Sequence, residues 1–503
     1  MTRGGVAAGS VLAQAEESQL CLWMARQYPL SVAAMLGAIS ATHIVKERRG
    51  FGQTIRPLPG SVVASTALGS WDPDPDYFFH WLRDSAMVID ALRHVIIEGS
   101  AAEEGLPRFK EFVTFSLSLN QLDGSRFLRE SGDFRKNVEP GFLQFVRDDN
   151  ELRAVTGDRV LGEPRFNPDA TLDISKWSRP QHDGPASRAI VLMRFWPLNG
   201  LDSATRAAMR TLIETDLRFT LEHWREPCFD LWEEELGQHY YTRLLQHAAL
   251  ADGARWMQEI GVEGAARQAC LTAAREILQS LDEHWNPEGG FYESRRDAVN
   301  PAPGKGLDFA VILAIIHAAR KEGTHSVQDP KVMATLAQLE DLFSASYEIN
   351  RNRPENLGPA MGRYTDDKYF SGGAYYFSTL GAAEFYYSLA EAVAAGADLP
   401  VAGANSVFLA GLGIADDSSA HLPQKNHERH FEALLRRGDQ FMATVAAYTP
   451  ATGELSEQFD QTTGAQTSAK SLAWSHAAFI TAFCRREAVL RTQNLASETS
   501  ASR

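Results

Sequence analysis

The sequence of 503 residues is 44% hydrophobic and 22% charged, which is the composition of an ordinary globular protein. Its formal net charge of −15, without any basic cluster, argues against a nucleic-acid partner. A neutral substrate is compatible with this charge, because electrostatic steering would contribute nothing to its capture.

Residues 1–16 are small and polar, and we expect them to form a flexible arm. They lack the contiguous apolar core of a signal peptide, and the apolar run 30–44 is too short to span a bilayer. The sequence therefore predicts a cytoplasmic protein without membrane association. Export by a non-classical route is the alternative.

The four cysteines are Cys21, Cys228, Cys270 and Cys484. They are widely spaced and form no CxxC pair, which predicts free, buried thiols and neither a disulfide framework nor a zinc site. The aspartates at 72, 74 and 76 resemble a calcium loop only superficially, because prolines interrupt them and no downstream glutamate completes the loop. We expect no metal and no cofactor.

Apolar residues recur with a period near 3.6 along most of the chain, which predicts an all-α protein with few and brief strands. Twelve helices are predicted, over residues 29–40, 81–99, 105–121, 183–197, 203–224, 236–261, 263–284, 308–321, 329–347, 374–395, 428–447 and 468–489. Several of the starts carry helix caps, for example Asp202 and Ser203 ahead of Ala204.

Short and long links alternate between these helices. Short links join antiparallel neighbours, and long loops tend to carry function. The alternation therefore predicts a ring of helical hairpins with every long loop at the same end. The long link 396–427 does not fit this pattern, and we expect it to be a surface excursion.

The stretch Phe229–Gln238 contains three consecutive acidic residues, Glu233 to Glu235, beside Asp230 and Trp232. They could simply form the acidic first turn of a helix. Glycosidic bond cleavage, however, requires two carboxyl groups and an aromatic surface for the sugar. A second acidic stretch around Glu457 favours that interpretation.

The other chemically suggestive residues fall in the long loops, so that they should meet at one rim of the ring. This convergence predicts a single carbohydrate cleft. The candidate site residues are Tyr77, Trp81, Arg83, Asp84, Trp177, Asp230, Trp232, Glu233, Glu234, Arg363 and Glu457.

These residues lie in segments that resemble the glucoamylases of glycoside hydrolase family 15, in the same order from about residue 20 to 490. The segments are Asp76–Ser85, Gly162–Asn167, Trp177–Pro185, Phe229–Glu234, Gly362–Asp367 and Ser456–Asp460, followed by Ser468-Ala469 and Leu472–Ser475.

The resemblance implies an (α/α)6 barrel with its cleft formed by loops at one end, in agreement with the ring of hairpins. It implies one catalytic domain over residues 17–490, a disordered tail over 491–503 and no starch-binding domain. It also implies an inverting exo-hydrolase that releases β-D-glucose from the non-reducing ends of α-1,4-glucans. We expect a monomer.

By position, Glu233 matches the general acid of the family and Glu457 its general base. Glu234 matches a residue that binds the second sugar. Arg83, Asp84 and Arg363 match residues that hold the terminal glucose. The matching aromatic residues of the cleft are Tyr77, Trp177 and Trp232.

Three departures from fungal relatives leave the preferred chain length and linkage open. Phe79 stands in place of a tyrosine, and Tyr375 stands in place of a tryptophan. The sequence of residues 235–237, shortly after the match to the general acid, also differs. One alternative is an enzyme of the same family that prefers α-1,6 bonds. A non-catalytic glucan-binding regulatory protein is a second alternative, which the presence of both glutamates disfavours.

Overall fold

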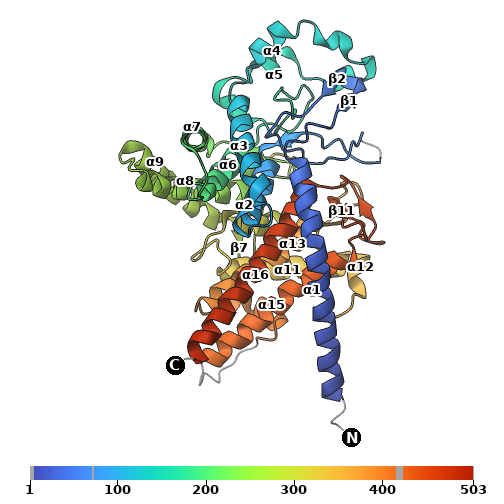
Figure 1. The fold of residues 1–503 in the computed structure, drawn as a ribbon, viewed down its shortest axis with the longest axis vertical. Helices are drawn as coiled ribbons and strands as arrows, with labels where there is room; N and C mark the ends of the chain where they lie inside the picture. Colours follow the sequence, from blue (N-terminus) through green and yellow to red (C-terminus); the bar gives the residue numbers. More distant parts are fainter. Residues whose placement is uncertain (1–4, 71–72, 415–422, 502–503) are drawn as a thin grey trace.

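A computed structural model describes the chain over residues 5–70, 73–414 and 423–501 (Figure 1). Six inner helices form a closed ring in which each packs against the next, and the last packs against the first. They are α2 (Leu82–Ile97), α6 (Asp183–Phe195), α8 (Tyr240–Glu259), α10 (Ala310–Ala318), α13 (Tyr376–Ala394) and α16 (Ala473–Ala501).

The first five inner helices each pack most closely against the outer helix that follows them along the chain, whereas α16 packs against α1. The outer helices are α3 (Ala102–Leu119), α7 (Ser203–His223), α9 (Ala265–Leu281), α11 (Pro330–Ser346), α15 (Pro423–Ala447) and α1 (Gly5–Ala38). Among the described residues these twelve helices form the predicted (α/α)6 barrel. The fold class is therefore confirmed.

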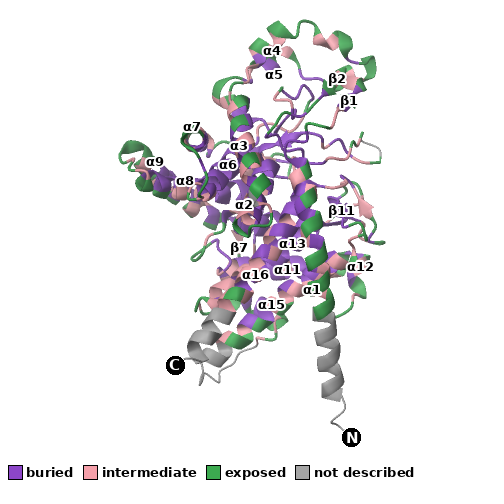
Figure 2. Ribbon diagram, in the orientation of Figure 1, coloured by how far each residue is buried: buried purple, intermediate pink, exposed green. Residues whose placement is uncertain are grey.

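Burial separates the two rings, as Figure 2 shows. The inner helix α13 is buried on all sides from Tyr376 to Tyr387. The outer helix α7 has a buried stripe that includes Met209, Ile213 and Leu217, with polar residues on its other faces. A helix between two layers needs apolar residues all round, whereas a surface helix needs only one apolar stripe.

Short antiparallel strand pairs brace the long loops that lead into the inner helices. β3 (His80–Trp81) pairs with β4 (Arg165–Phe166) ahead of α2. The strand β6 (Leu236–His239), ahead of α8, lies between β5 (Cys228–Phe229) and β9 (Arg295–Arg296). Ahead of α13, β10 (Ala374–Tyr375) pairs with β11 (Gln458–Phe459), which also pairs with β12 (Gln466–Thr467).

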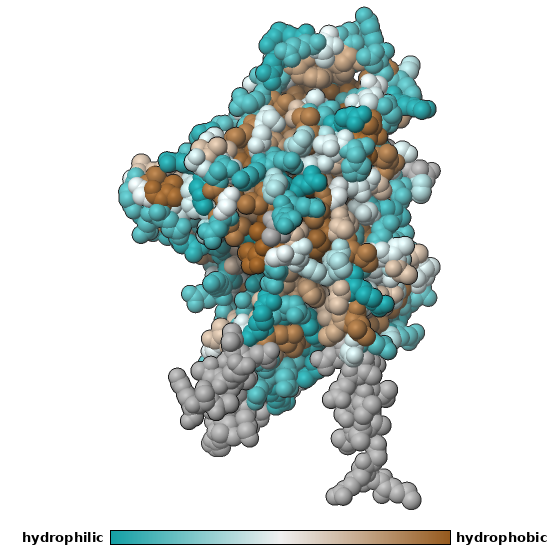
Figure 3. Space-filling model, in the orientation of Figure 1, coloured by the Kyte–Doolittle hydropathy of each residue, from teal (hydrophilic) through white to brown (hydrophobic). Residues whose placement is uncertain are grey.

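Two further strand pairs and four short helices lie in the remaining connections. They are β1 (Lys46–Arg48) with β2 (Gln53–Ile55), β7 (Trp285–Asn286) with β8 (Phe291–Tyr292), α4 (Gly124–Glu130), α5 (Asp149–Arg153), α12 (Glu348–Arg351) and α14 (Ser406–Gly411). In Figure 1, α4, α5, β1 and β2 lie together at the top of the molecule. Figure 3 shows that this top is largely hydrophilic.

Both ends of the chain are more helical than predicted. The first helix begins at Gly5 instead of residue 29, so that the segment expected to be a flexible arm continues α1. Alanines at 7, 8, 13 and 15 explain this, because alanine is the best helix former. Similarly, α16 runs to Ala501 through the expected disordered tail. Residues 1–4 and 502–503 lie outside the described part.

The helix predicted over residues 236–261 begins at Tyr240 as α8, four residues later than predicted, because β6 occupies Leu236–His239. The expected excursion 396–427 contains α14, which packs on α11. In it, Phe408 stacks on Tyr386 with ring centroids 5.4 Å apart. Residues 415–422 of this link are outside the described part.

No helix within residues 5–70, 73–414 and 423–501 is long and apolar enough to cross a membrane. The four cysteines are unpaired, as predicted. Three of them are buried, but Cys21 is exposed on α1, which corrects the expectation that all four are buried.

Candidate active site

A cavity of about 530 Å³ opens where the long loops meet the N-terminal ends of the inner helices. Phe377 and Trp474, from the starts of α13 and α16, both line it and stack on each other at 4.3 Å. Ten of the eleven predicted site residues also line it: Tyr77, Trp81, Arg83, Asp84, Trp177, Trp232, Glu233, Glu234, Arg363 and Glu457. The predicted convergence of the long loops therefore occurs.

Glu233 is held by nitrogen donors from two other loops. Its Oε1 accepts hydrogen bonds from Trp81 Nε1 at 2.7 Å and Gln181 Nε2 at 2.9 Å. Its Oε2 accepts from Trp177 Nε1 at 2.5 Å. The hydroxyl of Ser178 donates to the Glu233 carbonyl at 2.5 Å. Together these contacts fix both the backbone and the carboxyl plane of Glu233.

Glu233 and Glu234 lie in a tight turn rather than in a helix. Glu233 has a φ of +66°, the left-handed conformation that a residue with a Cβ adopts only at a cost. Its amide donates to the Asp230 carbonyl at 2.9 Å. The turn points the two adjacent glutamates to different partners, so the alternative of an acidic first turn of a helix is wrong.

Asp230 is the predicted site residue that does not line the cavity. It is buried beneath the turn, where Oδ1 accepts from the amides of Glu234 at 2.7 Å and Glu235 at 2.9 Å. Its Oδ2 lies 2.7 Å from Lys305 Nζ. Burial acts to raise the pKa of Asp230, but the Lys305 ammonium outweighs it and the pKa is lowered. Asp230 therefore shapes the turn, in place of the substrate contact that was expected.

Glu457 lies in the last long loop, immediately ahead of β11. It is buried, and it accepts hydrogen bonds from the hydroxyls of Tyr77, at 3.2 Å, and Ser468. Burial raises the pKa of Glu457 to about 7, although Ser468, Arg363 and Tyr77 act to lower it. Glu457 thus has hydroxyl partners, whereas Glu233 has nitrogen partners.

Arg83 and Asp84, at the start of α2, form one side of the cavity. Arg83 Nη1 donates to Gln181 Oε1 at 3.0 Å and to Asp183 Oδ2 at 3.1 Å. Asp84 Oδ2 lies 3.3 Å from Arg83 Nη2, but it accepts no hydrogen bond from the described residues. Burial raises the pKa of Asp84 to about 6, against the opposing effect of Arg83. Asp84 thus lines the cavity with a carboxyl group whose Oδ2 is buried and has no hydrogen-bond donor in the described part.

Glu234 and Arg363 form another side of the cavity. Arg363 Nη2 lies 2.8 Å from Glu234 Oε1, and two of its nitrogens donate to Asp367 at 2.6 and 2.7 Å. Glu234 Oε2 accepts from Lys305 Nζ and Tyr364 OH, both at 2.5 Å. Arg363 is buried, whereas a third of the Glu234 side chain is exposed. Glu234 is therefore both held in place and accessible.

Several residues of this site were not predicted. Gln181 and Ser468 lie within the segments that carry the family resemblance, but nothing in the sequence indicates that they bind the two glutamates. Trp232 Nε1 donates to both oxygens of Asp308, at 2.9 and 3.0 Å, and burial raises the pKa of Asp308 to about 7. Tyr369 OH lies 2.8 Å from Tyr77 OH. Apart from Ser468 and Glu457, which are 11 residues apart, these contacts join residues more than fifty positions apart, which no local pattern reveals.

The described residues contain no group of three or more His, Cys, Asp or Glu side chains arranged to hold a metal ion. The side chains of the cavity are instead carboxylates, guanidinium groups and aromatic rings. Such a set can transfer protons and bind hydroxyl groups.

The chain is similar to known glycoside hydrolases. The family model described as "Glycosyl hydrolases family 15" matches residues 51–484. Glucoamylase 1 of Rhizopus oryzae is 28% identical over 484 residues, which cover 92% of this chain and 71% of that protein. The probable glucoamylase of Schizosaccharomyces pombe is 28% identical over 502 residues, which cover 97% of each chain. The solved structure of Hormoconis resinae glucoamylase superposes with a TM-score of 0.74 at 28% identity, covering 93% of this chain and 73% of that one.

Proposed function

The chain belongs to glycosyl hydrolases family 15, and from that premise we propose that it is an exo-acting, inverting glucoamylase. Its substrates are the non-reducing ends of α-1,4-linked maltooligosaccharides, dextrins and soluble starch, and its product is β-D-glucose. The choice of α-1,4 bonds is supported by the names of the relatives, which are glucoamylases.

The observation that carries the proposal is the meeting of Glu233 and Glu457 in one cavity, although more than two hundred residues separate them in sequence. A glycosidase needs one carboxyl group that gives a proton and one that takes a proton. These two are held by different kinds of partner, so each can have its own role. The cavity volume of about 530 Å³ suits a ligand of a few sugar units.

We assign Glu233 as the general acid. It protonates the glycosidic oxygen as the bond from that oxygen to the anomeric carbon breaks. We assign Glu457 as the general base, which removes a proton from the water that attacks the anomeric carbon from the opposite face. A base works best when its pKa is near the operating pH, and the pKa of Glu457 is about 7.

Arg83, Asp84 and Arg363 bind the terminal glucose. Asp84 offers a buried acceptor, and Arg83 and Arg363 offer buried donors, so together they can satisfy several hydroxyl groups of one sugar. The stacked rings of Phe377 and Trp474 contribute to the cavity wall. A glucose unit that is contacted on several sides leaves no room for a further sugar there, so it must be the end of a chain. This supports exo action.

The two roles can be separated with α-D-glucosyl fluoride, whose leaving group needs no protonation. We expect Glu233→Gln to lose maltose hydrolysis by several orders of magnitude but to retain most of its activity on the fluoride. Glu457→Gln should lose both activities, because the water is then not activated. The reverse pattern would exchange the two assignments.

Proton NMR at early times in a maltotriose digest tests the stereochemistry. Release of β-glucose is expected for an inverting enzyme, and release of α-glucose would instead require a retaining mechanism. Isomaltose in a parallel digest tests the linkage preference. Faster hydrolysis of isomaltose would favour the α-1,6-preferring alternative.

A further inference from the structure

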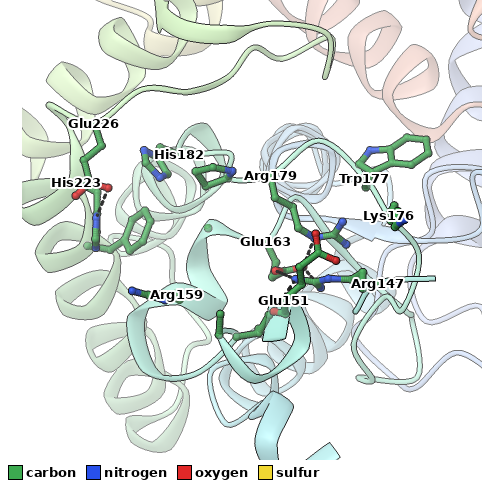
Figure 4. A pocket seen from close by; sticks show the side chains of 15 residues that line it. Arg147, Glu151, Arg159, Glu163, Lys176, Trp177, Arg179, His182, His223 and Glu226 are labelled. Atoms are coloured by element: carbon green, nitrogen blue, oxygen red, sulfur yellow. Dashed lines mark hydrogen bonds and ion pairs between the residues drawn. The ribbon is translucent and has the colours of Figure 1, made fainter. Parts of the chain in front are cut away.

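Two of the tryptophans that line the active-site cavity donate their indole N–H groups to different carboxyl groups. Trp177 donates to Glu233, and it also borders a neighbouring cavity of about 630 Å³, where Figure 4 shows it beside Lys176. Trp232 donates instead to Asp308, at 3.0 Å from Oδ1 and 2.9 Å from Oδ2. Asp308 is not among the residues that line the active-site cavity. It can therefore influence a substrate only through the residues that it contacts.

The carboxyl group of Asp308 is buried and fixed. The residue lies just ahead of α10, and its Oδ1 also accepts from the amide of Ala310 at 2.8 Å. Its backbone forms an antiparallel bridge with Tyr364, and the amide of the next residue, Phe309, donates to the Arg363 carbonyl at 2.8 Å. Both the side chain and the backbone of Asp308 are thus held. An acceptor fixed in this way sets the direction of any N–H group that binds it.

The other contacts of the Trp232 ring are less directional. Its centroid lies 6.1 Å from that of Phe377 and 6.2 Å from that of Tyr375, in the outer half of the range for interacting rings. The guanidinium carbon of Arg363 lies 5.3 Å from the same centroid. Tryptophan has a single hydrogen-bond donor, and in Trp232 both of its contacts go to Asp308. This hydrogen bond is therefore the most directional restraint on the ring.

Trp232 lies beside the scissile bond in the proposed mechanism. It directly precedes Glu233, the proposed acid, which must reach the oxygen that joins the terminal glucose to the leaving glucose. On the other side of Glu233 in the chain, Glu234 matches the family residue that binds the second sugar. Trp232 and Glu234 both line the cavity, and Trp232 is only half-buried. An aromatic ring at this place offers a flat apolar surface to the leaving glucose.

We propose that Asp308 is a positioning residue that sets the linkage preference of the enzyme. Through its hydrogen bond it holds the Trp232 ring at one angle to the leaving glucose. An α-1,6 bond attaches that glucose through its exocyclic carbon, which adds a rotatable bond and tilts the sugar differently from an α-1,4 bond. A fixed aromatic surface can match only one of these arrangements, whereas a ring that rotates can follow both. The inference rests on the proposed function.

The test compares kcat/KM for maltose, isomaltose and α-D-glucosyl fluoride in the wild type, Asp308→Leu and Asp308→Asn. Leucine is similar in size to aspartate but accepts no hydrogen bond. In Asp308→Leu we expect the ratio of kcat/KM for maltose to that for isomaltose to move two- to tenfold towards one, the effect of one hydrogen bond. Asparagine keeps an acceptor, so Asp308→Asn should change the ratio less than twofold. The fluoride has no leaving glucose, and its kcat/KM should change less than twofold in both variants.

Trp232→Phe removes the same hydrogen bond from the side of the donor. It should shift the ratio in the same direction, and Asp308→Leu should add nothing in that background. If Asp308→Leu does not fold, Trp232→Phe alone decides the question. An unchanged ratio in Trp232→Phe would then contradict the proposal.

Asp329→Leu is the matched control. Asp329 is also a buried carboxyl at the start of a helix, α11, where it accepts from the Tyr292 hydroxyl at 3.1 Å and from the Lys331 amide at 2.8 Å. It does not line the active-site cavity. This change should lower the stability of the fold without moving the ratio.

Equal losses on maltose and isomaltose in Asp308→Leu would overturn the inference, because they would place its effect on Glu233 or on the fold. An equal loss on all three substrates would do the same. A wild-type ratio of one would also overturn it, since there would be no preference for Asp308 to set. If the wild type hydrolyses none of the three substrates, the proposed function fails instead.

Discussion

Trp81 and Trp177 donate their indole N–H groups to different oxygens of Glu233, at 2.7 and 2.5 Å. One tryptophan belongs to β3 and the other to the loop ahead of α6. Because each oxygen has its own donor, the carboxyl plane cannot rotate without breaking a hydrogen bond. The orientation of the proposed acid is therefore set by two segments nearly a hundred residues apart in sequence.

Trp177→Phe should keep the aromatic surface but remove the donor to Glu233 Oε2. A typical hydrogen bond is worth about 0.5–1.5 kcal/mol, so we expect kcat for maltose to fall about two- to tenfold. Trp224→Phe is the matched control, since the buried indole nitrogen of Trp224 has no partner in the described part. Steady-state kinetics on maltose would measure both, and equal losses would contradict a specific role for Trp177.

The guanidinium group of Arg165 packs against the rings of the same two tryptophans. Its guanidinium carbon lies 3.5 Å from the ring centroid of Trp177 and 5.1 Å from that of Trp81, while its Nε donates to Asp173 at 2.9 Å. Arg165→Met should therefore lower kcat more than it raises KM, by displacing both donors to Glu233.

Arg165→Lys should restore part of this kcat, because the cation over the ring is kept. Tryptophan fluorescence of both variants would report whether the rings have moved. A change in KM alone, with unchanged kcat and fluorescence, would show that Arg165 does not position the acid.

The pH dependence of kcat/KM should report Glu457. A general base must be ionised, and the pKa of Glu457 is about 7, so kcat/KM should fall below about pH 7. Ser468 donates to Glu457 and lowers its pKa, so Ser468→Ala should move this limb to higher pH. Asp308→Asn should leave the limb in place, which would distinguish Glu457 from the other carboxyl group whose pKa is about 7.

The stability of the fold should also depend on the ionisation of Glu457. It should decrease as the pH rises, whereas kcat/KM should increase. The unfolded chain ionises Glu457 near pH 4.5, but the folded chain does so near 7. The favourable contribution of the protonated form is complete below 4.5 and is lost as the pH rises through 7. Glu457→Gln should therefore gain up to about 3 kcal/mol relative to the wild type between pH 4 and 8. Urea unfolding at both pH values would test this, and a constant difference would contradict it.

Lys305 is the counter-ion of the turn that carries Glu233. It is buried and lies 2.7 Å from Asp230 and 2.5 Å from Glu234. Lys305→Met would leave the buried Asp230 carboxylate without its cation, which should cost about 3–5 kcal/mol of stability. Denaturant unfolding would measure this loss. In Asp230→Asn/Lys305→Met the cost should be smaller than in the single variant, because no unpaired charge remains.

Much of the fold follows from periodicity and link length. The alternation of short and long links places Glu233 and Glu457 at the same rim, because antiparallel hairpins return every long loop to one end. The errors lie where local sequence is ambiguous. The segment Leu236–His239 has helix-forming neighbours, yet pairing with Phe229 and Arg295 makes it a strand. Such pairing is decided by tertiary contacts rather than by propensity.

The site was predicted less completely than the fold. Asp230 was expected to bind substrate as part of the acidic stretch 229–238, but proximity in sequence does not show which way a side chain points. Gln181 and Ser468 were missed for a related reason. Their importance lies in the partner that each one reaches, and those partners are 52 and 11 residues away.

The ring closes where α16 packs against α2 and α1. During translation, α1 and α2 leave the ribosome long before α16, the helix that packs against both of them. The nascent barrel must therefore remain an open arc, with apolar surface exposed to chaperones and proteases, until the residues from Ala473 onward emerge. Because Glu457 lies between α15 and α16, the proposed catalytic base can join the cavity only after the other five inner helices have been synthesised.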